Sequence, residues 1–213
     1  MERYVYWGVF LCLSFFVYLI SAIVFRKVTL EDMLSSVKLD INLQQMIESE
    51  QRITDFLKKN DLNYGSSIWD IAKILKVEQG KEDSTLKEQA NISEPDQNGI
   101  STVNFQESLS FEEKKFYFAH ECAHIINGDP LPNKRPEGRN KSIEDQLADY
   151  TAAAILMPRA EIRFYLKENN YESVSTRRRV GIIKQMCRKY EVTPILALRR
   201  IKEIQELEKA SCN

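Results

Sequence analysis

The two histidines of this chain are its only ones, and they stand four residues apart in the HExxH motif of residues 120–124. On an α-helix, residues i and i+4 lie on one face, so His120 and His124 can hold one ion between them. Zinc accepts imidazole nitrogens and, in catalytic sites, keeps a position open for water. Glu121 would lie beside the ion, where it can take a proton from that water. The motif therefore requires a helix and predicts a zinc-dependent peptidase with Glu121 as its general base.

The surroundings of the motif have to support this interpretation, because HExxH occurs by chance in roughly one chain in a few hundred. The alternative is a surface helix with two solvated histidines, or one histidine packed in a core. Ser110-Phe111-Glu112-Glu113 has the sequence of a capping box and predicts a helix start, and Gly128-Asp129-Pro130 predicts its end. The motif therefore lies on a helix with defined ends, as a metal site requires.

Composition excludes little. A formal net charge of -1, with 29% charged residues, gives no global argument for a nucleic-acid ligand or an acidic substrate. The four cysteines, at positions 12, 122, 187 and 212, show no CxxC spacing. They indicate neither a disulfide framework nor a zinc ribbon, and they suit a reducing compartment.

The N-terminal region contains a run without charged side chains, residues 4–25, rich in Phe, Leu, Val, Ile and Tyr. About 20 apolar residues cross a bilayer as a helix, so we expect residues 1–27 to be a single-pass membrane anchor. A cleaved signal peptide is the alternative, but its apolar region is usually shorter. Arg26 and Lys27 follow the run and Arg3 precedes it, which favours a cytoplasmic C-terminal domain.

The remainder of the chain divides near a turn at residues 63–67. Residues 28–65 are polar with apolar residues at helical spacing, which predicts a juxtamembrane helical linker. Residues 66–213 would form the metallopeptidase domain, with strands at 84–86 and especially at 100–105, where β-branched residues alternate. The predicted fold is α+β, a mainly helical, zincin-like domain with a small β-sheet beside the HExxH helix, preceded by one transmembrane helix.

The zinc site needs a third protein ligand, and no third histidine exists. The metzincin pattern would place a histidine where Pro130 stands, so that class is excluded. A carboxylate must therefore complete the site. Ser142 opens a second helix through Met157, which stops at Pro158, and this helix carries acidic residues within 143–150.

The two helices together resemble the ImmA/IrrE family of metallo-endopeptidases. The resemblance rests on HExxH at 120–124, on residues 148–158, which are similar to A-[ND]-x-[FY]-A-A-x-L-L-M-P and share its Leu156-Met157-Pro158 ending, and on the strand at Val103-Asn104. It covers about residues 66 to 205. It implies a thermolysin-like site in which Glu121 is the base. A carboxylate four residues before Asp149 would be the third ligand, and Asp149 would orient a histidine.

The chain departs from the family at this third ligand. Asp145 stands four residues before Asp149, where the family has Glu, and the glutamate is one place earlier, at Glu144. Asp145 shares a helix face with Asp149, whereas Glu144 is rotated by about 100°. We therefore expect Asp145 to be the ligand, with Glu144 as the alternative. Either carboxylate can also be only structural, as a capping residue or as a partner of the helix dipole.

Residues 160–210 are basic, with 12 Lys or Arg against 7 Asp or Glu. Arginine clusters at 177–179 and 199–200 accompany a helix-turn-helix outline at 181–207, which suggests DNA binding. Charge on helices is more often a solvated face, so we do not expect direct nucleic-acid binding.

Together these features predict a membrane-anchored zinc endopeptidase that faces the cytoplasm. The family resemblance implies a protein substrate, typically a helix-turn-helix repressor. The alternative is a catalytically silent binding module that sequesters a transcriptional regulator, because a shortened third ligand could leave the site without zinc.

Overall fold

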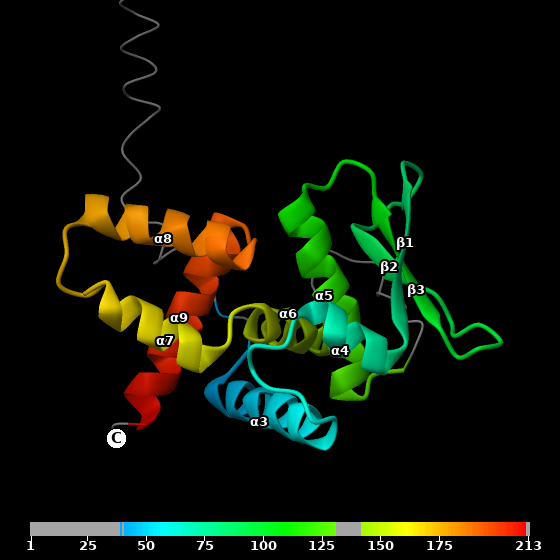
Figure 1. The fold of residues 1–213 in the computed structure, drawn as a ribbon, viewed down its shortest axis with the longest axis horizontal. Coiled ribbons are helices and arrows are strands. Elements are labelled where there is room, and N and C mark those ends of the chain that lie inside the picture. Colours follow the sequence, from blue (N-terminus) through cyan, green and yellow to red (C-terminus); the bar gives the residue numbers. More distant parts are fainter. Residues whose placement is uncertain (1–38, 40, 131–141, 212–213) are drawn as a thin grey trace, which may run out of the picture. The chain divides into compact units, whose positions relative to one another are not determined.

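The computed structural model describes residues 39, 41–130 and 142–211 (Figure 1). They belong to one compact unit, Val37–Asn213. Its described helices and strands are α3 (Leu43–Lys59), α4 (Ile68–Leu75), β1 (Val77–Asp83), β2 (Ala90–Ile92), β3 (Ser101–Gln106), α5 (Phe111–Asn127), α6 (Ile143–Leu156), α7 (Arg159–Glu168), α8 (Thr176–Tyr190) and α9 (Pro194–Ser211). This arrangement confirms the predicted α+β class, mainly helical with a small sheet.

The three strands form one sheet in the order β1-β3-β2, with β1 parallel and β2 antiparallel to the central β3. Alternate residues of β3, Ser101, Val103 and Phe105, are buried, as the alternating sequence predicts. Phe118 of α5 is buried against Phe105, with ring centroids 6.4 Å apart. The sheet therefore packs beside α4 and the HExxH helix (Figure 1).

The strand predicted at residues 84–86 is wrong. Strand β1 lies earlier and ends at Asp83, and residues 84–85 form a turn. The Asp83 carboxylate accepts hydrogen bonds from the Thr85 N–H and hydroxyl, at 2.7 and 2.6 Å. This local side-chain bonding favours a turn over continuation of the strand.

Helices α5 and α6 pack against each other and have the predicted ends. The capping box of α5 joins the Ser110 N–H to Glu113 Oε2 at 2.8 Å, and the helix ends at Gly128 with a φ of 83°. Ser142 caps α6 by accepting a hydrogen bond from the Asp145 N–H at 3.1 Å. Pro158 follows the end of α6, so both elements of the predicted site are held in position.

Helix α3 lies within residues 28–65, the predicted juxtamembrane linker. It buries Met46, Ile53 and Leu57 and packs against α6. It thus belongs to the same compact unit as α5 and α6, and the linker boundary at residue 65 stays a prediction.

Helices α7, α8 and α9 group on the far side of α6 from the sheet (Figure 1). The predicted helix, turn and capped helix are present as α8 and α9, and the Leu196 N–H donates to Thr193 Oγ1 at 3.4 Å. Helix α9 also contacts α3 and α6, so the C-terminal part of the chain packs against the helix that follows the HExxH helix.

The predicted membrane span at residues 4–25 lies outside the described residues. Among the residues that the structure describes, no helix combines the length and the apolar character needed to cross a bilayer.

Candidate metal centre

Helix α5 presents both histidines and the glutamate of the motif to the interior. His120, Glu121 and His124 are 1%, 3% and 1% exposed. The two imidazole rings are 4.7 Å apart, and their Nε2 atoms approach to 3.1 Å. The i, i+4 spacing thus places two nitrogens side by side in a dry environment, and the surface-helix alternative does not fit this burial.

Helix α6 brings a carboxylate to the same point. Oδ1 of Asp145 lies 3.7 Å from Nε2 of His120 and 3.6 Å from Nε2 of His124. With the 3.1 Å between the nitrogens, the circle through these three atoms has a radius of about 2.0 Å, which is a zinc–ligand distance. Two imidazole nitrogens and one carboxylate oxygen are also a donor set that catalytic zinc takes, so the residues fit this ion.

The structure places Asp145, and not Glu144, with the histidines. Asp145 is 4% exposed, whereas the Glu144 side chain is exposed. A capping role of Asp145 is compatible with this position. Its backbone N–H donates a hydrogen bond to Ser142 Oγ, while its carboxylate faces the imidazoles. Whether Asp145 is a ligand stays a prediction.

Each histidine has a carboxylate on its other ring nitrogen. Asp149 Oδ1 lies 2.9 Å from Nδ1 of His120, as the family resemblance implies, and Asp129 Oδ2 lies 2.8 Å from Nδ1 of His124. Such contacts fix the tautomer and the ring orientation, leaving both Nε2 atoms directed at the common point. Sequence reasoning used Asp129 only as part of a helix end. Asp129 stands five residues after His124, in the turn that ends α5. This spacing could have identified it as a partner of that histidine.

The charges around the site favour a cation. In the described chain, four carboxylates are buried, those of Glu121, Asp145, Asp149 and Glu203, against the buried Arg200 and the half-buried Arg199. Buried carboxylates need compensating charge, and a divalent ion would offset much of this excess.

The histidine pKa values reflect the same environment. Burial lowers the pKa of His120, but the Asp145 and Asp149 carboxylates outweigh it and hold that pKa above its usual value. Burial and the neighbouring His120 hold the pKa of His124 below its usual value. The directions differ because two imidazolium ions with Nε2 atoms 3.1 Å apart would repel each other.

The arginine pair of α9 has internal partners. Arg200 is fully buried, and Arg199 bonds to Asp149 at 3.4 Å and to Glu203 at 2.9 Å. These guanidinium groups are therefore unavailable to a phosphate backbone, whereas Arg177 and Arg178 are exposed.

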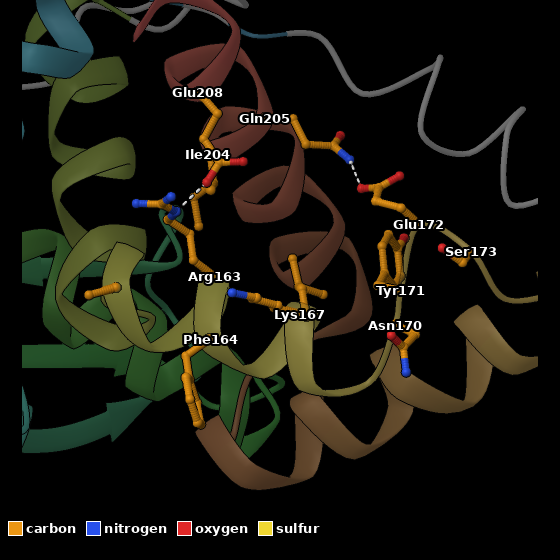
Figure 2. A pocket seen from close by; sticks show the side chains of 12 residues that line it. Arg163, Phe164, Lys167, Asn170, Tyr171, Glu172, Ser173, Ile204, Gln205 and Glu208 are labelled. Carbon is orange, nitrogen blue, oxygen red and sulfur yellow. Dashed lines mark hydrogen bonds and ion pairs between the residues drawn. The ribbon is translucent and has the colours of Figure 1, made fainter. Parts of the chain in front are cut away.

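A hollow of about 570 Å³ lies between α7 and α9 (Figure 2). Among its lining residues, Arg163 forms an ion pair with Glu208, and Gln205 donates a hydrogen bond to Glu172. None of the predicted site residues lines it.

A buried HExxH helix whose histidines meet a carboxylate of the following helix defines the class of zincin-like metalloproteins. The chain belongs to the M78 peptidase family, since residues 74–202 match the family described as the IrrE N-terminal-like domain. This match confirms the family resemblance for that part of the chain.

No protein among the curated ones matches the sequence. Among solved structures, the chain is similar to a Mycobacterium tuberculosis transcriptional regulator, with 16% identity and a TM-score of 0.45. The similarity covers 74% of this chain and 46% of that regulator, so the chain spans about half the regulator's length.

Proposed function

We propose that this chain is a zinc-dependent endopeptidase in which His120, His124 and Asp145 hold the metal and Glu121 is the general base. The observation that carries the proposal is the convergence of three ligand atoms on one point about 2.0 Å from each. Membership in the M78 peptidase family supports it.

The chemistry follows from the residues around that point. Zinc, when bound, supplies a Lewis acid that polarises the scissile carbonyl. Glu121 accepts the proton of the attacking water and returns it to the leaving nitrogen, so it acts as base and then as acid. Asp149 and Asp129 hold the two imidazoles in the orientation that the ion requires.

A decisive experiment compares the full-length protein with its Glu121→Gln and His120→Ala variants. Wild type is expected to carry about one zinc per chain and to cleave a co-expressed helix-turn-helix repressor. Glu121→Gln should keep the zinc but lose about 10²–10⁴-fold in cleavage rate, since it lacks a proton acceptor. His120→Ala should lose the zinc. Equal cleavage by wild type and Glu121→Gln contradicts the catalytic role.

The substrate part of the proposal rests on the family resemblance, which implies a regulatory protein such as a helix-turn-helix repressor. The membrane part rests on the charge-free sequence of residues 4–25, with the catalytic domain in the cytoplasm. Full-length protein is expected to stay with membranes after a carbonate wash, and a variant without residues 1–27 is expected in the supernatant. Release of the full-length protein by the wash contradicts the anchor.

A second candidate is a catalytically silent module that sequesters a transcriptional regulator. It is favoured by one observation, the aspartate at position 145 where the family resemblance has glutamate. This candidate predicts no zinc in the wild-type protein together with intact binding of the regulator. The same metal analysis therefore separates the two functions.

A further inference from the structure

A continuous chain of hydrogen bonds and ion pairs leads from His120 to helix α3. It runs through Asp149 of α6 to Arg199, Glu203 and Arg200 of α9, and it ends at Glu50 of α3. The two arginines are neighbours in the sequence, but they face different ends of this chain.

The carboxylate of Asp149 is shared between the site and α9. Its Oδ1 lies 2.9 Å from Nδ1 of His120, and its Oδ2 lies 3.4 Å from Nη1 of Arg199. Asp149 is 1% exposed, so water does little to stabilise its charge or to fix its orientation. The guanidinium therefore holds the oxygen that does not face the histidine.

Arg199 is itself held in place. Its Nε donates to Oε1 of Glu203 at 2.9 Å, and the other oxygen of Glu203 accepts from Nη1 of Arg200 at 3.4 Å. Arg200 is anchored to the backbone oxygen of Met157 at 3.0 Å and to Glu50 at 2.7 Å. Glu203 thus fixes the guanidinium of Arg199 between two carboxylates.

We propose that Arg199 is a positioning residue of the metal centre, which acts through Asp149 on the orientation and donor strength of His120. This inference rests on the proposed zinc site. It makes α9 part of the site, although no residue of α9 belongs to the histidine cluster. The competing explanation is that Arg199 only attaches α9 to α6.

Arg200 provides a matched control for this distinction. Arg199 and Arg200 lie side by side on α9, and both pair with Glu203. Only Arg199 reaches Asp149, whereas Arg200 reaches Glu50 on α3. Arg199→Met and Arg200→Met therefore both break an ion pair with the buried Glu203, but only the first removes a partner of Asp149.

The experiment measures zinc affinity of full-length variants by competition with a chromophoric chelator, with the cobalt absorption spectrum and the Tm of the metal-free protein as further readouts. Groups that orient a ligand directly contribute about 10–100-fold in affinity, so Asp149→Asn should lose that much and Arg199→Met, one step further out, about 3–10-fold. Arg199→Met should also shift the cobalt spectrum. Arg200→Met should lower the Tm while keeping wild-type affinity and spectrum.

The outcomes distinguish a failure of the Arg199 role from a failure of the proposed zinc site. Wild-type zinc affinity and an unchanged cobalt spectrum in Arg199→Met, or an equal loss of affinity in Arg200→Met, overturn the role of Arg199 and leave the proposed function standing. Absence of zinc binding by wild type overturns both. If Arg199→Met does not fold, Arg199→Gln replaces it, because glutamine keeps a hydrogen-bond donor but removes the charge. Wild-type affinity in that variant likewise contradicts the proposal.

Discussion

At the residue scale, three aspartates surround the histidine pair, and each faces different nitrogen atoms. Asp145 lies near both Nε2 atoms, whereas Asp149 and Asp129 each hold one Nδ1 atom. In the proposed zinc site, Asp145 is a ligand, and the other two aspartates orient one. Substitutions at these positions should therefore differ in their effect on zinc.

Asp145→Ala is expected to lower zinc affinity by more than about 100-fold, because it removes a ligand and not only a group that orients one. Glu144→Ala is the matched control, since that exposed side chain is adjacent in sequence, and it should keep wild-type affinity. Zinc content by mass spectrometry and chelator competition measure the difference. Loss of zinc in Glu144→Ala with retention in Asp145→Ala would reverse the assignment.

Asp129→Asn is expected to lower zinc affinity by about 10–100-fold, because the amide orients the His124 ring without the negative charge that strengthens its Nε2 as a donor. Asp55→Asn, an exposed change on α3, serves as the control. Chelator competition on both variants is the measurement. An unchanged affinity in Asp129→Asn would mean that this residue only completes the end of α5.

At the element scale, α3 and α9 support the site from behind. Glu50 of α3 accepts hydrogen bonds from Arg200 at 2.7 Å and from the Tyr150 hydroxyl at 2.9 Å. The fully buried guanidinium depends on this carboxylate and on Glu203 for compensation. Helix α3 is therefore attached to α6 and α9 by charge as well as by its apolar face.

Glu50→Ala is expected to lower the free energy of unfolding by about 3 kcal/mol, because it leaves the buried guanidinium of Arg200 with one carboxylate fewer. Glu48→Ala on the same helix should change it by less than about 0.5 kcal/mol, since Glu48 pairs with Arg52 only at the surface. Urea unfolding of both variants gives the comparison. Equal stability of Glu50→Ala and wild type would show that Arg200 finds compensation elsewhere.

At the scale of the whole molecule, the site is built where α5 and α6 pack together, so we expect binding of the proposed zinc to be coupled to folding. The ligand atoms converge only in the folded state, because Asp145 and the two histidines come from different helices. An ion that binds the folded but not the unfolded chain raises the free energy of unfolding. The increase grows with the logarithm of the ratio of ion concentration to Kd.

Removal of zinc by a chelator is expected to lower Tm, and zinc at 100 times Kd should raise the Tm of the metal-free protein by about 5–10 °C, since about 2.7 kcal/mol is gained and each kcal/mol shifts Tm by about 2–4 °C. Differential scanning calorimetry measures the shift. His120→Ala should show no response to zinc. A shift of equal size in that variant would place the ion elsewhere.

The local features of this protein could be predicted from its sequence. The HExxH helix with its capping box and glycine end, the stop of α6 before Pro158 and the alternating strand β3 all depend on residues within a few positions of one another. Steric and hydrogen-bonding rules act at that range, so pattern and structure agree. The strand expected at residues 84–86 is wrong because the Thr85 N–H and hydroxyl bond to the Asp83 carboxylate, which favours a turn.

Tertiary structure alone decided which charges lie behind the histidines. The contact between Arg199 and Asp149 spans 50 residues, and that between Arg200 and Glu50 spans 150. The arginine pair of α9 has the same sequence whether it faces solvent or buried carboxylates. Only the packing of α9 against α3 and α6 distinguishes these two cases. The sequence by itself determined which residues can bind a metal. The packing of helices far apart in the chain decided which carboxylates reach them, because burial removes water and leaves each charge dependent on its neighbours.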